Sequence, residues 1–126
     1  MFAGILITGG YESSVSVEVF NPHNNKSCNL TNLPNIRYGH TLCGGLLCGG
    51  DYYSLSCLLW NKANRTFEPT EVRLQRGRAH HLCWNVPNNN GVLLIGGTGD
   101  SSKTSELVVS DGSSSIPAFE LQYPAT

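Results

Sequence analysis

Two adjacent glycines follow a short apolar run at three places in this chain. The pairs are Gly9-Gly10, Gly49-Gly50 and Gly96-Gly97, and the runs before them are residues 5–8, 46–48 and 92–95. The first two pairs are 40 positions apart and the last two are 47 apart, a repeat length typical of small β-sheet units rather than of helical arrays. The sequence therefore predicts a repeated all-β fold.

The strand after each pair alternates between apolar and polar residues. Residues 14–20 place Val17 and Val19 on one face, and residues 54–60 repeat the pattern 40 positions later, with Trp60 in the place of Phe20. A turn rich in Asn follows both, and a short apolar strand is expected after each turn. Near the end of the chain, residues 111–115 predict a polar turn and residues 118–121 a last short strand. Because apolar runs are only four or five residues long and are interrupted by Gly, Pro and Asn, we expect strands and no helix.

An arginine and a histidine also recur, 41 positions apart, as Arg37 with His40 and Arg78 with His81. Residues in equivalent places of successive repeats are expected to hydrogen-bond within or between the units, rather than to catalyse or to bind a metal. The recurring aromatic residues are expected to pack between sheets. Residues 87–91 predict a longer loop than Gly44-Gly45, which lies at the equivalent place of the preceding repeat. This longer loop accounts for the spacing of 47 positions between the last two glycine pairs.

The composition excludes several classes of function. Charged residues make up 13% of the 126 residues, the net charge is −1, and no run of Lys or Arg occurs, so no nucleic-acid partner is expected. Residues 1–7 are apolar but lack the basic flank of a signal peptide, and we expect a strand there. No apolar stretch approaches the ~18 residues that span a bilayer, so no membrane insertion is expected.

Five cysteines are many for a reduced domain of this size, and none forms a C-x-x-C pair. Cys48 and Cys57 lie on either side of a glycine pair, at the ends of two consecutive antiparallel strands. Cross-strand Cα distances of ~4.5 to 5.5 Å suit a disulfide, so this pairing is preferred. Cys43 with Cys48 is the rival pairing, and the sequence alone does not select between them.

Three N-x-S/T sequons lie in or just after turns, at Asn25, Asn29 and Asn64, where glycans would be accessible. Sequons and cysteines together favour an oxidising, extracellular location; a cytoplasmic one is the alternative. No Ser-His-Asp set, carboxylate pair or phosphate-binding loop is present, so no catalytic residue, metal or cofactor is expected. The loops at 11–14, 51–54 and 98–104 are candidates for ligand contact, with Tyr11, Tyr52 and Tyr53 as exposed aromatic residues.

These elements, in this order, resemble the Kelch repeat, and more narrowly the cysteine-containing extracellular Kelch proteins of invertebrates. The resemblance covers nearly the whole chain. It rests on Ser27-Cys28-x-Leu30, Leu33-Pro34, Arg37-x-x-His40-Thr41, Leu47-Cys48-Gly49-Gly50, Ser56-Cys57-Leu58, His81-x-x-Trp84 and Thr104-Ser105-Glu106-Leu107-Val108. It implies β-propeller blades, each a four-stranded antiparallel sheet: a partial blade at 1–38 and blades at 39–79 and 80–126. About three blades make an incomplete ring, since the family closes with about five to seven.

The resemblance also implies a function. Kelch propellers present loops on a rigid scaffold, so we expect a non-catalytic module that binds a protein or a glycan, completed by further blades in the same chain or by oligomerisation. One alternative is a fragment of a copper enzyme similar to galactose oxidase, which shares the propeller. The other is a truncated propeller without activity of its own, because an incomplete ring leaves open sheet edges.

Overall fold

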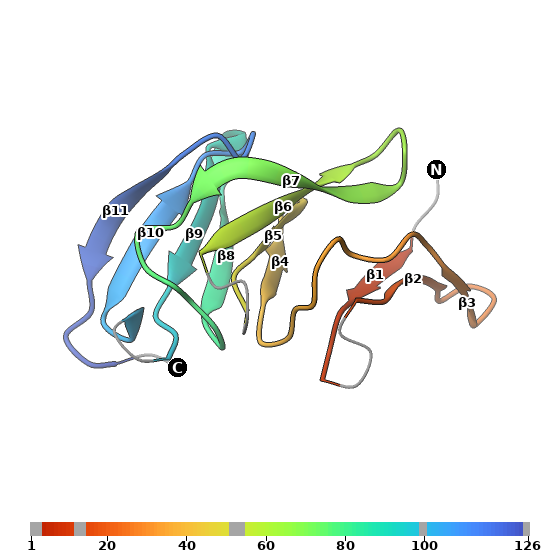
Figure 1. The fold of residues 1–126 in the computed structure, drawn as a ribbon, viewed down its shortest axis with the longest axis horizontal. Coiled ribbons are helices and arrows are strands. Elements are labelled where there is room, and N and C mark those ends of the chain that lie inside the picture. Colours follow the sequence, from red (N-terminus) through yellow and green to blue (C-terminus); the bar gives the residue numbers. More distant parts are fainter. Residues whose placement is uncertain (1–3, 12–14, 51–54, 99–100, 125–126) are drawn as a thin grey trace.

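The computed structural model describes residues 4–11, 15–50, 55–98 and 101–124, and these residues form three antiparallel sheets (Figure 1). The first sheet contains β1 (Ile5–Thr8), β2 (Val17–Asn21) and β3 (Lys26–Asn29). The second contains β4 (Thr41–Cys43), β5 (Leu46–Cys48), β6 (Ser56–Asn61) and β7 (Thr66–Arg73). The third contains β8 (Leu82–Val86), β9 (Gly91–Ile95), β10 (Thr104–Val108) and β11 (Ser115–Glu120).

The all-β class predicted from the sequence is confirmed. Within each sheet, strands that follow one another in the chain are neighbours, and the sheets fall within residues 1–38, 39–79 and 80–126. Figure 1 shows them in chain order from one side of the molecule to the other. A 3₁₀ turn, η1 (Pro87–Asn89), lies in the longer loop expected there. No helix in these ranges has the length and apolar character needed to cross a membrane.

Two apolar layers hold the sheets together. Between the first and second sheets, Val17 and Leu33 pack against residues of the second sheet such as Leu58. Between the second and third, residues such as Leu46 pack against Leu94 of β9. The second sheet therefore contributes residues to both layers, because successive side chains of a strand point to opposite faces.

The glycine pairs end β1, β5 and β9, and at Gly49 the need for glycine is steric. The residue has φ of +70°, and a Cβ there would collide with the backbone carbonyl oxygen of Arg78. Any other residue would meet both this collision and the penalty for a left-handed backbone. The close approach brings the segment after β7 against the end of β5.

Two strands differ from the sequence-based expectation. The strand after the first Asn-rich turn, β3, is polar and exposed along its whole length instead of apolar. The last strand begins at Ser115, where a turn was expected, and not at Ala118. It begins early because Ser115 and Ile116 pair with Val108 and Leu107 of β10. The register of this pairing then shifts at a β-bulge between Glu106 and Thr104.

Candidate functional site

Arg37 joins the first sheet to the second. The side chain is fully buried, and its guanidinium donates to the carbonyl oxygens of Gly49 and Ser56, at 3.0 and 2.9 Å. Its backbone carbonyl oxygen accepts from the N–H of Gly10, at 3.3 Å. One residue thus binds the glycine pair of one sheet through its backbone and the pair of the next sheet through its side chain.

Arg78 repeats this link between the second and third sheets. Its carbonyl oxygen accepts from the N–H of Gly50 at 2.7 Å, and its guanidinium donates to the carbonyl oxygens of Gly96 and Thr104, at 2.7 and 3.0 Å. A charge this deeply buried is tolerated when it is fully hydrogen-bonded. The two arginines therefore serve to connect sheets.

Glu106 completes the second link. Its Oε2 lies 2.8 Å from Nε of Arg78, and both side chains are buried. The other carboxylate oxygen, Oε1, accepts from the Ser115 hydroxyl at 2.6 Å and from the N–H of Gln75 at 2.7 Å. The sequence did not predict that Glu106 pairs with Arg78. Its position in the repeat was the available signal. Glu106 pairs with Leu94 of β9, whereas the equivalent residue of the second sheet, which pairs with Leu47 of β5, is the apolar Leu58.

His40 and His81 bridge sheets beside the arginines. Nε2 of His40 lies 2.9 Å from the hydroxyl of Thr8, and Nε2 of His81 lies 2.8 Å from that of Thr41. Both Nδ1 atoms are buried and have no hydrogen-bond partner among the described residues. Burial lowers the pKa of His40, with a further contribution from the charge of Arg37.

The pKa of His81 is lowered to about 4, first by burial, then by the positive charge of Arg78 and by electrostatic interactions with His40 and His80. Both histidines are therefore neutral at pH 7. Among the described residues, no group of three or more His, Cys, Asp or Glu side chains is arranged to hold a metal ion. The arginines, the histidines and the six glycines of the pairs thus lie together as a structural network.

Two disulfides are present. Cys48–Cys57 joins β5 to β6 at a directly paired register position, with Cα atoms 4.1 Å apart, as preferred from the sequence. The rival pairing of Cys43 with Cys48 is wrong. In the β4–β5 hairpin Cys43 is opposite Leu46 and Cys48 is opposite Thr41, so the two cysteines are not neighbours.

Cys43 is bonded instead to Cys83 in the third sheet, with Cα atoms 6.3 Å apart. The two cysteines are 40 positions apart, which is one repeat, and this spacing was the signal for a bridge between adjacent sheets. Cys28, on β3, is an exposed free thiol. The two disulfides indicate an oxidising environment.

The predicted ligand-contact and glycan residues are placed as follows. Tyr11 is 82% exposed and meets Tyr38 edge-on, with ring centroids 5.5 Å apart. Tyr52 and Tyr53 lie outside the described residues. In the third loop Ser101 is fully buried and its carbonyl oxygen accepts from Arg78, so this part of the loop belongs to the network. The sequon asparagines, Asn25, Asn29 and Asn64, are all exposed.

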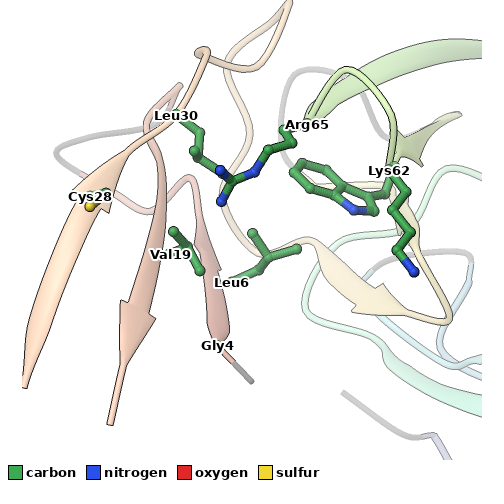
Figure 2. Close-up of a pocket in the computed structure, with 8 residues that line it drawn as sticks. Gly4, Leu6, Val19, Cys28, Leu30, Lys62 and Arg65 are labelled. Carbon is green, nitrogen blue, oxygen red and sulfur yellow. The ribbon is translucent and has the colours of Figure 1, made fainter. Parts of the chain in front are cut away.

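A groove between the first and second sheets was not foreseen from the sequence (Figure 2). It encloses about 780 Å³. Its lining combines apolar residues of both sheets with two cations of the β6–β7 turn, and consists of Gly4, Leu6, Val19, Cys28, Leu30, Trp60, Lys62 and Arg65. Trp60 also packs on Phe67, with ring centroids 4.9 Å apart, so the recurring aromatic residue contributes both to the sheet and to the groove. The groove forms only where two sheets meet, so no local motif could indicate it.

Comparison with known proteins places the chain in no family. No protein-family model matches it, and no curated protein is significantly similar to it in sequence.

Changing Glu106 to Gln tests the buried ion pair. The substitution keeps the shape of the side chain but leaves the charge of Arg78 without its carboxylate. We expect the free energy of unfolding, measured by urea titration at pH 7, to fall by about 3 kcal/mol. The exposed Glu120→Gln should change it by less than about 0.5 kcal/mol. Equal effects of the two substitutions would contradict the assigned role.

The lowered pKa of His81 predicts a loss of stability in acid. The unfolded chain takes up a proton near pH 6.5, whereas folded His81 stays neutral down to about pH 4. Stability should therefore fall between these values, by about 3 kcal/mol from this residue, and this group adds no further loss below pH 4. Urea titrations across this range should show a shallower pH dependence for His81→Gln; an unchanged slope would contradict the prediction.

Proposed function

We propose that this chain is part of a Kelch-type β-propeller and that it binds a protein or a glycan outside the cell without catalysing a reaction. The observation on which this proposal rests is the row of glycine pairs joined by Arg37 and Arg78. These links repeat the same geometry from sheet to sheet, as successive blades would. They also hold the glycine pairs that precede the three candidate loops on one rigid support.

The chemistry of the recurring residues supports binding rather than catalysis. Both arginines hydrogen-bond to backbone carbonyl oxygens, and both histidines are neutral and lie against threonine hydroxyls. At the start of the first candidate loop, Tyr11 is an exposed aromatic side chain that meets Tyr38 edge-on. Exposed tyrosine on a rigid base is a common contact in protein recognition. The disulfides and the exposed sequons support an extracellular location.

The outer faces of the end sheets support further blades. On the third sheet, Leu82, Trp84 and Ile116 are about half exposed or more, and they lie on the face away from the buried layer. On the first sheet, Ile5 and Ile7 are similarly exposed. Sheets that are apolar on both faces pack between two neighbours. We infer that further blades, in the same chain or in a second copy, cover these faces.

Tyr11→Ser tests the loop surface. We expect the chain to bind a defined member of an immobilised glycan array or of a random peptide library. Tyr11→Ser should weaken that binding about tenfold or more. Tyr123→Ser is the matched control, since Tyr123 is exposed near the other end of the chain. Absence of any retained glycan or peptide, or equal binding by both variants, would contradict the proposal.

The end faces predict self-association. Gel filtration with light scattering should show the purified chain as a discrete oligomer, because apolar faces of two copies can cover one another. Trp84→Gln should shift the distribution toward monomer, whereas Tyr123→Ser should not. A wild-type chain that remains monomeric up to its solubility limit would show that these faces need no covering sheet.

A further inference from the structure

The groove between the first two sheets has the features of a small-molecule site, separate from the proposed loop surface. Gly4, at one end of β1, lines it, whereas Tyr11 follows the other end of the same strand. Its volume of about 780 Å³ falls in the range of ligand sites in proteins, roughly 300 to 1,000 Å³. The side chains of Leu6, Val19 and Leu30 make the lining mainly apolar.

The charge of the groove is one-sided. Its two charged lining residues, Lys62 and Arg65, are both cationic and exposed, and no acidic side chain lines it. The one salt bridge found among the described residues is that of Arg78, so neither Lys62 nor Arg65 is neutralised by a carboxylate there. Figure 2 shows the side chain of Arg65 extending toward Leu30. The groove thus combines an apolar surface with an unneutralised guanidinium.

The backbone of Arg65 is strained where the equivalent residue of the first sheet is not. Arg65 has φ of +56° and Asn25 has φ of +59°, and their N–H groups donate to the carbonyl oxygens of Asn61 and Asn21 at 2.8 and 2.9 Å. The two turns therefore have the same conformation. Asparagine tolerates the left-handed region, whereas arginine is disfavoured there. Backbone strain of this kind is concentrated at functional sites, and Arg65 lines the groove.

We propose that this groove binds a fatty acid in its carboxylate form. The acyl chain lies on the apolar lining, and the carboxylate is bound by Arg65 with support from Lys62. A guanidinium matches a carboxylate in a planar, two-point hydrogen bond, so it selects this head group over a neutral one. Each methylene group removed from water adds to the affinity, so longer chains bind more tightly.

Other ligand classes fit the groove less well. A sugar would leave its hydroxyl groups without partners on the apolar lining. A nucleic acid would need more phosphate contacts than two cations provide.

The binding test uses Trp60 as the reporter. Trp84→Phe leaves it as the single tryptophan of the chain. Titration with laurate, below the concentration at which it forms micelles, should shift the Trp60 emission and saturate. Dodecanol has the same chain length but a neutral hydroxyl group, and its affinity should be at least about tenfold lower. Absence of a saturable shift with laurate, or equal binding of dodecanol, would overturn the proposal.

Arg65→Asn separates binding from structure. The substitution removes the cation and places at this turn the residue that the first sheet uses, so the urea midpoint should be unchanged or higher. Laurate binding should weaken about tenfold. Lys103→Gln, which removes an exposed cation that does not line the groove, should leave binding unchanged. A lower urea midpoint for Arg65→Asn with unaltered laurate binding would assign Arg65 a structural role and overturn the proposal.

Cys28 supplies a second readout. It lines the groove, and the other four cysteines form the two disulfides. A maleimide therefore labels this position alone. Saturating laurate should slow the labelling of the wild-type chain, because the acyl chain covers the groove. The labelling of Arg65→Asn should be unaffected at the same concentration. Equal labelling rates with and without laurate in the wild-type chain would show that the fatty acid does not occupy the groove.

Discussion

The arrangement of the three sheets depends on one interaction, the hydrogen bonding of a buried arginine to the glycine pairs of two neighbouring sheets. Arg37 and Arg78 each accept a hydrogen bond at the backbone from the sheet before and donate at the side chain to the sheet after. A guanidinium out of contact with water requires several acceptors in fixed directions. A glycine corner supplies one of these acceptors and the next strand supplies others, so each arginine joins two sheets through several hydrogen bonds at once.

This requirement determines the use of the other polar residues. Glu106 neutralises Arg78, whereas Arg37 binds the side-chain oxygens of Asn35 and Ser56, at 3.0 and 2.6 Å. The neighbouring histidines are held neutral by burial and by the arginine charges, so they join sheets without adding charge to the interior. The titratable groups of the repeats thus maintain the scaffold. The surfaces proposed for binding are the loops that follow the glycine corners and the apolar groove.

The two disulfides act at different levels of the structure. Cys48–Cys57 joins adjacent strands of one sheet, at a position where the register alone brings the cysteines together. Cys43–Cys83 joins two sheets and reinforces the link that Arg78 makes through hydrogen bonds. The second and third sheets are therefore connected covalently, whereas the first and second are connected by Arg37, His40 and an apolar layer. The groove lies at the junction of the first and second sheets.

The sequence by itself determined what depends on neighbours along the chain. Alternation predicted strands such as β2 and β6, the glycine pairs predicted the corners, and hairpin register favoured Cys48–Cys57. The tertiary structure alone decided which residues of different sheets meet. It brought Glu106 to Arg78, Cys83 to Cys43 and Arg65 to the groove. Such contacts depend on how far apart and at what angle sheets pack, and no local pattern encodes these quantities because they result from the packing of all the side chains between the sheets.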